Sequence, residues 1–176
     1  MRSLPPEGAL SGFGRTGATE MAALPDAVAA HLASHHVMTL ATVGEDGPWA
    51  AAVFYAHEGA SLYFLSAPST RHCRNLAHDA RCAATIQHDV ADWPAVLGLQ
   101  IEGRARALDG AEARAAHEVY GRKFALVADL GRAPLAIAAA FARIRWYRLD
   151  AERVHLIDNR RGFGHRDSFE LAPPPP

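Results

Sequence analysis

The sequence predicts a mainly β fold with added helices: a small antiparallel β-barrel of six strands, with the helices at its periphery. Short runs rich in β-branched and aromatic residues recur along the chain and are separated by tight turns. Single helical segments interrupt these runs without the βαβ alternation that is typical of parallel sheets. The chain has 176 residues, of which 49% are hydrophobic, which is enough for one domain with one core.

The first half of the chain predicts one helix followed by an antiparallel meander. LPDAVAAHLASHHV (24–37) places Val28, Ala29, Leu32 and Ala33 on one helical face. The period then changes to that of strands, and GEDGP and HEGA are turn signals. The strands expected around these two turns are VMTLATV (37–43), WAAAVFYA (49–56) and SLYFLS (61–66).

The second half predicts two helices among the remaining strands. The helices are expected at about 70–79 and 110–122, and Asp109 with Glu112 forms a capping-box pattern at the start of the second. Residues 124–142 are alanine-rich and are expected to be helical in part. The strand candidates are ARCAATIQ (80–87), LGLQIEGRARAL (97–108), IRWYRLD (144–150) and RVHLID (153–158).

Composition predicts three regions in the chain. Residues 1–22, rich in Gly, Pro, Ser and Thr, are expected to form a flexible N-terminal arm, and residues 23–170 the barrel domain. The Pro-rich end, 171–176, is expected to be a disordered tail.

Charge and hydropathy argue against several classes of function. Charged residues make up 21% of the chain and the formal net charge is −1, so a general nucleic-acid or membrane-surface binder is not expected. No stretch is long and apolar enough to span a membrane. The N-terminal residues lack the apolar core of a signal peptide, so we expect a cytoplasmic protein that acts on a small molecule.

The stretch SAPSTRHCRNL (66–76) places a cysteine among basic residues, which raises the question of a metal site. Cys73, His78 and Cys82 lack the paired spacing of a zinc site, so none is predicted. Helical spacing puts Cys73 on the same face as Leu76, where a thiol acts as a small buried hydrophobe. His31 and His35 have a chelating i, i+4 spacing, but histidines near a helix C-terminus more often cap the helix or lie on its surface than bind a metal.

The same stretch predicts an anion site. Ser69 or Thr70 can cap the helix and leave free N–H groups in its first turn. Arg71 and His72 lie in that turn, where the helix dipole disfavours positive charge unless an anion is bound there. The alternative is that Arg71 and Arg74 are simply solvated and that His72 is a surface residue.

The order of these elements resembles a known family. The run TLATVGEDGPWAAAVFYAHEGASLYFLSAPSTRHCRNLAHDARCAATI, continued through LQIEGRAR, is similar to the core of the pyridoxamine 5′-phosphate oxidase-like, FMN-binding split-barrel proteins. IDNRRGFGHR resembles an uncharacterised bacterial subgroup of that family. The resemblance implies a split barrel, an FMN-dependent oxidoreductase activity, and a homodimer with cofactor sites at the subunit interface.

The resemblance also implies a set of cofactor-binding residues. One strand is expected to lie along the flavin ring through its backbone: Ala51, Ala52, Val53, Phe54 and Tyr55. Ser66 matches a position near the ring or the ribityl chain, and Gln100 a glutamine that approaches the ring, often from the partner chain. The phosphate site is matched by Ser69, Thr70, Arg71 and His72. Trp93 is placed to cover the flavin, and His165 and His72 are candidate proton donors.

Departures from the family pattern leave other functions open. The strand WAAAVFYA has no basic residue for the phosphate, and no R-x-H substrate motif is present, so oxidation of vitamin B6 itself is not expected. Haem binding or degradation is the first alternative, motivated by ten histidines. A flavin-binding protein without turnover is the second, and a deazaflavin could replace FMN. A loop carrying Phe163, His165 and Arg166 could close over the ligand.

Overall fold

A computed structural model describes residues 24–128, 141 and 143–171 of the chain. Its strands are β1 (Val37–Gly44), β2 (Gly47–Glu58), β3 (Ser61–Ser66), β4 (Arg81–Gln87), β5 (Leu97–Ala107), β6 (Arg145–Asp158) and β7 (Arg166–Glu170). Its helices are α1 (Asp26–Ser34), α2 (Arg71–His78), α3 (Gly110–Lys123) and α4 (Ala125–Ala128), with short 3-10 turns η1 (Trp93–Ala95) and η3 (Asn159–Arg161). The predicted 1–22 arm and most of the predicted tail lie outside the described residues.

The strands form one antiparallel sheet that closes on itself. Their order is β3-β2-β1-β4-β5-β6-β7, and β3 also pairs with β6, from Ser61 opposite Asp150 to Ser66 opposite Arg145. The pairing closes β1 to β6 into a six-stranded barrel, which confirms the predicted fold class. β7 is an added strand at the edge of β6, formed by residues that the sequence left unassigned.

The two strand candidates 144–150 and 153–158 are one continuous strand, β6. Its register against β5 shifts between Glu102 and Gly103, so that Glu152 is the extra residue of a β-bulge. Gly103 permits this bulge, because a Cβ there would lie 2.2 Å from the carbonyl oxygen of Asp150. The bulge bends β6 so that one long strand pairs with both β3 and β5.

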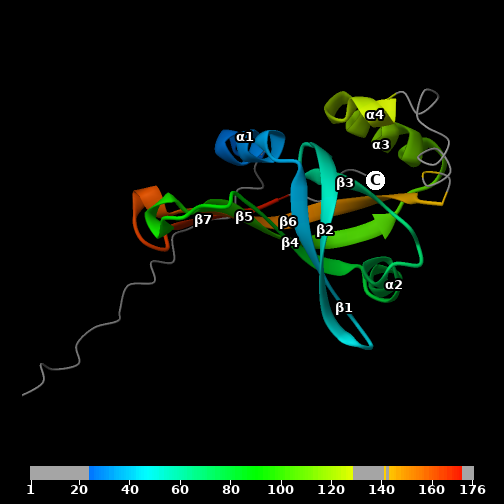
Figure 1. Cartoon of the computed structure of the whole chain (residues 1–176), viewed down its shortest axis with the longest axis horizontal. Coiled ribbons are helices and arrows are strands. Elements are labelled where there is room, and N and C mark those ends of the chain that lie inside the picture. The colour runs from blue at the N-terminus through cyan, green and yellow to red at the C-terminus, as the bar shows by residue number, and fades with distance from the viewer. Residues whose placement is uncertain (1–23, 129–140, 142, 172–176) are drawn as a thin grey trace, which may run out of the picture.

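Along the strands, every second side chain points into the barrel and fills its core. The side chains between them face outward. Along β1, inward residues such as Met38 and Leu40 are fully buried and their neighbours are exposed. A second apolar cluster lies outside the barrel, where Val119 and Tyr120 of α3 pack near Tyr63 of β3. Figure 1 shows α3 and α4 together at one end of the molecule and β7 at the other.

The helices start and end close to the predicted positions, but the capping box is wrong. Asp109 makes no side-chain cap hydrogen bond to α3. Glu112 instead accepts two hydrogen bonds from Arg106 of β5 and lies 3.5 Å from Arg148. A charge-assisted, bidentate contact is stronger than a single bond to a backbone N–H, so the carboxylate turns to the sheet.

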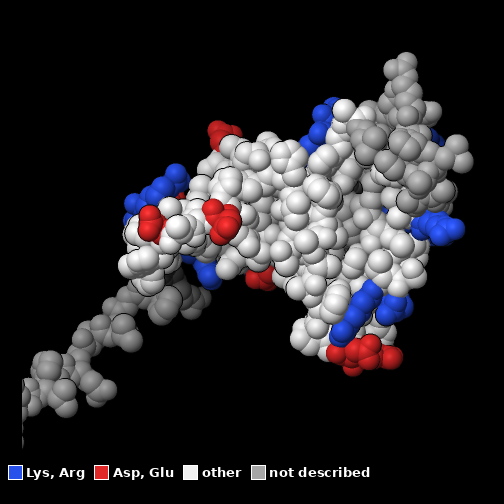
Figure 2. Space-filling model, in the orientation of Figure 1, with Lys and Arg blue, Asp and Glu red and all other residues white. Residues whose placement is uncertain are grey.

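Part of the outer sheet face carries small side chains and no helix. Register places Thr39 and Ala41 of β1 beside Thr85 and Ala83 of β4, and three of these four are exposed. Ala52 of β2 lies opposite Thr39 on the same face. Over the middle of the molecule as seen in Figure 2, few charged side chains are present, and most lie toward the periphery.

Candidate functional site

Three polar side chains meet between β3 and α2. Ser66 is the last residue of β3, Thr70 is the N-cap residue of α2, and His72 lies in its first turn. The Ser66 hydroxyl lies 2.6 Å from His72 Nε2, and the Thr70 hydroxyl lies 3.2 Å from both. Ser66 and His72 are each 8% exposed, so both side chains are largely buried.

The first turn of α2 has N–H groups that Thr70 does not cap. The Thr70 hydroxyl donates to the carbonyl of Ala67 at 2.8 Å and makes no cap bond to the helix. The first helical hydrogen bond runs from Arg74 N to Thr70 O. Uncapped N–H groups and the positive end of the helix dipole favour an anion at this position.

The polar groups of the same region shift the pKa of the Cys73 thiol. Cys73 is 3% exposed, which confirms the prediction that it is buried. Burial raises its pKa, but hydrogen bonding with His72, Thr70, Tyr147 and Ser66 outweighs that effect and lowers the pKa to about 7. A lowered pKa of a buried thiol is the effect that an anion-favouring environment would have, and titration of Cys73 tests it.

A pocket of about 510 Å³ joins this cluster to β2. Pockets of this size commonly hold small-molecule ligands and cofactors. One wall is formed by Ala52, Val53 and Phe54 of β2, and Ser66 and His72 lie at its polar end. The opposite wall is apolar: Leu65, Tyr120, Phe124, Val127, Phe141 and Ile144. The structure thus brings five of the predicted cofactor-binding residues together.

Other predicted residues of this region direct their side chains elsewhere. The Arg71 guanidinium donates to the carbonyl of Asp46 at 2.7 Å and lies over the ring of Trp49, so the pocket lining does not include it. Ser69 is exposed. Tyr55 points into the barrel and donates to the carbonyl of Leu32, so only its backbone remains on the side of the pocket.

The remaining predicted residues lie at the other end of the molecule, beside β7. Trp93 is 62% exposed and meets the ring of Phe163 edge-on, with centroids 4.5 Å apart. Gln100 accepts a hydrogen bond from Arg166 at 3.0 Å. His165 lies 3.2 Å from a carboxylate oxygen of Asp167. Within one copy of the chain, these residues do not line the pocket.

Sequence reasoning missed the apolar wall of the pocket. Tyr120 and Phe124 are four residues apart across the end of α3, and Phe54 packs against Phe124 with ring centroids 5.8 Å apart. The helix was expected from its capping pattern, but the apolar spacing of Ala116, Val119 and Tyr120 was the signal for the face that covers β2 and β3.

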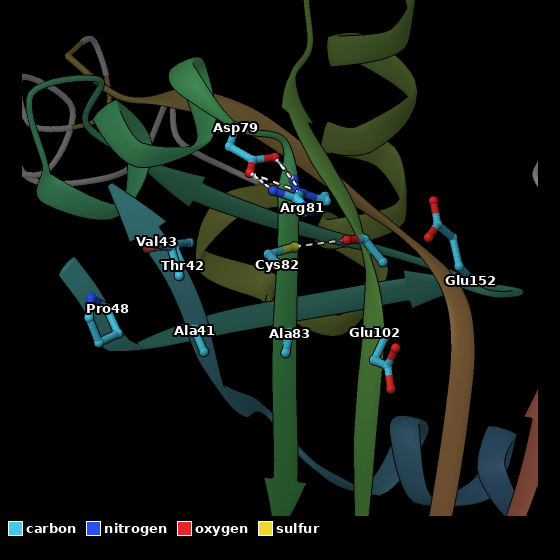
Figure 3. Close-up of a pocket in the computed structure, with 11 residues that line it drawn as sticks. Ala41, Thr42, Val43, Pro48, Asp79, Arg81, Cys82, Ala83, Glu102 and Glu152 are labelled. Carbon is cyan, nitrogen blue, oxygen red and sulfur yellow. Dashed lines mark hydrogen bonds and ion pairs between the residues drawn. The ribbon is translucent and has the colours of Figure 1, made fainter. Parts of the chain in front are cut away.

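A second hollow, of about 500 Å³, lies across β1, β4 and β5 and contains none of the predicted residues. Figure 3 shows Asp79 and Arg81 side by side at one end, with Glu102 and Glu152 on neighbouring strands. Hydrogen bonding to Arg81, 2.6 Å away, lowers the pKa of Asp79 to about 2. A lining with three carboxylates repels a phosphate, so this hollow is a poor site for a phosphorylated cofactor.

In the part of the chain that the structure describes, no three or more His, Cys, Asp or Glu side chains are placed to hold a metal ion together. None of the helices in that part has the length and apolar character needed to cross a membrane.

Comparisons with known proteins agree with this geometry. A family model described as pyridoxamine 5′-phosphate oxidase matches residues 24–158. The UPF0306 protein YhbP of Escherichia fergusonii is 28% identical over 142 residues, covering 80% of this chain and 88% of that protein.

Two solved structures are similar to the chain. A haem-binding protein from Mycobacterium smegmatis has 28% sequence identity and a TM-score of 0.62, covering 81% of this chain and 57% of that one. The chain thus spans little more than half of that protein. A putative pyridoxamine 5′-phosphate oxidase from Listeria innocua shares the fold at 19% identity and a TM-score of 0.58, covering 76% and 97%. The family model, the barrel and the order of the elements lead to one conclusion: the chain belongs to the pyridoxamine 5′-phosphate oxidase family.

Proposed function

We propose that the protein binds FMN in the pocket between β2, α2 and α3 and acts as an FMN-dependent oxidoreductase. The observation that carries this proposal is the arrangement of apolar and polar side chains in one pocket. An apolar slot runs along Ala52, Val53 and Phe54 and ends at the hydroxyl cluster of Ser66 and Thr70. A flavin mononucleotide has the same division, a flat ring at one end and a phosphate at the other.

The residues present fit the phosphate through neutral donors. The uncapped N–H groups of α2 and the Ser66 hydroxyl would supply hydrogen bonds, and the helix dipole supplies positive potential, whereas the Thr70 hydroxyl donates to the carbonyl of Ala67. The Arg71 side chain, bound to Asp46 and stacked on Trp49, contributes no direct charge in this arrangement. We therefore expect FMN to bind with modest affinity.

The protein's own side chains would orient the flavin and exclude water from it. When bound, the flavin would supply the redox chemistry. Phe54, Tyr120 and Phe124 form an apolar lining that shields one side of the site. His72 Nε2, held by Ser66 at 2.6 Å, can hold a proton at the polar end.

The proposed active form is a homodimer. The pocket lies where the helix-covered part of the outer sheet face meets the uncovered part, which carries Thr39, Ala41 and Ala83. A second copy packed on this face would wall the open side of the pocket. In such a dimer Gln100 of one copy would approach the pocket of the other, as the family pattern implies.

The experiment is a titration of the purified protein with FMN, followed by flavin absorbance and calorimetry. We expect saturable binding, and a loss of affinity of about tenfold in Ser66→Ala, because its hydroxyl can no longer donate to the phosphate. Ser168→Ala, an exposed hydroxyl at β7, is the control and should leave affinity unchanged. Absence of FMN binding would overturn the proposal, and bound FMN that no nicotinamide cofactor reduces would indicate a binding protein without turnover.

Haem is the second candidate, favoured by the 28% identity to the haem-binding protein of M. smegmatis and by the apolar walls of the pocket. His72 is already bonded through Nε2, so an iron ligand would have to displace Ser66 or come from another histidine such as His165. Titration with haemin distinguishes the two: a sharp Soret band lost in His72→Ala or His165→Ala favours haem. A deazaflavin bearing the same phosphate end would compete with FMN for the Ser66 cluster.

A further inference from the structure

Three histidines gather where the end of α1 meets the end of β4. The rings of His31 and His35 are stacked, with centroids 3.9 Å apart. The ring of His88, the residue after β4, lies 4.1 Å from that of His35 and 6.0 Å from that of His31. His31 and His35 are only 6% and 8% exposed, whereas His88 is exposed. None of the three lines the proposed cofactor pocket.

Each ring of the buried pair donates one hydrogen bond to a backbone carbonyl. His31 Nε2 lies 3.0 Å from the carbonyl of Ile86, and His35 Nδ1 lies 2.8 Å from the carbonyl of His31. Because a carbonyl only accepts, each of these two nitrogens carries a hydrogen, in the neutral ring and in the protonated ring alike. A second hydrogen on His35, at Nε2, would be buried with no acceptor among the described residues, so the geometry favours the neutral ring.

The groups around the cluster add positive charge. Lys123 of α3 donates to the carbonyls of Leu32 and His35, and its ammonium group lies 4.2 Å from the ring centroid of Tyr55 on β2. Burial, and then the charges of His35 and His88, lower the pKa of His31. Asp26 lies in the first turn of α1, at the far end of the helix. Among the described residues no ion pair joins these rings to a carboxylate, so two protons on the stacked rings would repel each other without compensation.

The same end of α1 contacts the wall of the pocket. The ring of His36 packs edge-on against Phe124, with centroids 5.8 Å apart, and Phe124 packs against Phe54 at the same separation. Phe124 and Phe54 both line the pocket. Lys123, which holds the carbonyls of α1, directly precedes Phe124 in the chain. A change in how α1 is docked is thus coupled to the pocket wall through two neighbouring residues.

We propose that His31, His35 and His88 form an acid-sensitive latch: neutral imidazoles hold the end of α1 on the barrel, and their protonation releases it and loosens the Phe124 wall of the pocket. The latch itself stands on the packing of α1, and its effect on cofactor retention rests on the proposed function.

The direction of the pH dependence follows from proton binding. Once α1 is released, His31 titrates near its ordinary pKa of 6.5, while in the docked state burial lowers its pKa. As pH falls, the released state takes up protons that the docked state does not, so docking weakens. Between about pH 7.5 and 5.5, each imidazole that docking keeps neutral weakens it by about tenfold.

The test is hydrogen exchange of the protein without added cofactor, at pH 7.5 and 5.5, with rates corrected for intrinsic pH dependence. We expect the protection of residues 26–36 to fall by about tenfold or more at the lower pH, while that of β5 is retained. His35→Phe keeps a stacked ring that cannot take a proton, and it should make this fall clearly smaller, because one of the two buried imidazoles is removed. His78→Gln, an exposed histidine on α2, is the control and should behave as the unmodified protein.

Unchanged protection of residues 26–36 at pH 5.5, or an equal fall in His35→Phe, would overturn the latch. If His35→Phe does not fold, His88→Gln serves instead, because His88 is exposed; it should reduce the fall. FMN affinity measured at both pH values separates the two proposals. Failure to bind at pH 7.5 would count against the proposed function alone, whereas loss of affinity at pH 5.5 that His35→Phe restores supports the coupling.

Discussion

At the scale of single residues, the environment of Cys73 differs from what its helical position indicated. Spacing predicted a thiol packed among apolar residues, and the side chain is indeed buried beside Leu76. Its other neighbours are the hydroxyls of Ser66, Thr70 and Tyr147 and the ring of His72, which come from separate segments of the chain. No helical pattern contains those contacts, because they depend on how β3, α2 and β6 converge.

The two cysteines give a prediction that checks this environment. Hydrogen bonding lowers the pKa of the Cys73 thiol to about 7, whereas burial raises that of Cys82 to about 12. A titration followed by thiolate absorbance near 240 nm should therefore show one ionisation close to neutral pH, absent in Cys73→Ala. A first ionisation only above about pH 9 would show that the cluster does not stabilise an anion.

Arg71 shows why residue types alone did not define the phosphate site. Its position in the first turn of α2 agreed with the prediction, and its backbone N–H remains at the helix terminus. The long side chain, however, can reach the carbonyl of Asp46 and the face of Trp49 in the β1–β2 hairpin. Sequence spacing cannot choose between such partners, since both become available only after the sheet forms.

At the scale of elements, the sequence predicted most strands and helices with their approximate ends. Alternation and turn residues located β1 to β5, because those signals are local. β7 and the continuity of β6 were missed. The segment RRGFGHR has glycines that indicate a loop, but its last residue, Arg166, begins β7, which pairs with the edge of β6.

The β-bulge between β5 and β6 gives a prediction at this scale. Gly103→Ala should lower the free energy of unfolding by about 2 kcal/mol or more, because the new methyl group would overlap the Asp150 carbonyl on a backbone that cannot move alone. Gly110→Ala is the matched control: no atom lies within 4 Å of its Cβ position, and only its φ of +57° is strained. Chemical denaturation measures both, and an equal loss would show that the bulge is not constrained by Gly103.

At the scale of the whole molecule, the uncovered face of β1 and β4 predicts association. If a second copy packs on this face, Ala83→Arg should yield a monomer by light scattering and should also weaken FMN binding, since the open side of the pocket would lose its wall. Ala115→Arg, on the exposed side of α3, is the control and should leave both unchanged. A dimer that survives Ala83→Arg with full affinity would place the interface elsewhere.

The closure of the barrel by β3 and β6 also has a consequence for how the chain folds. Ser61 and Asp150, whose side chains are joined by a 2.7 Å hydrogen bond, are 89 residues apart in the sequence. The hairpins β1–β2 and β2–β3 close short loops, but this pairing must wait until β4, β5 and α3 are arranged between its two strands. Closure is therefore expected late in folding, after the local contacts of Ser66 with Thr70 and His72 can already form.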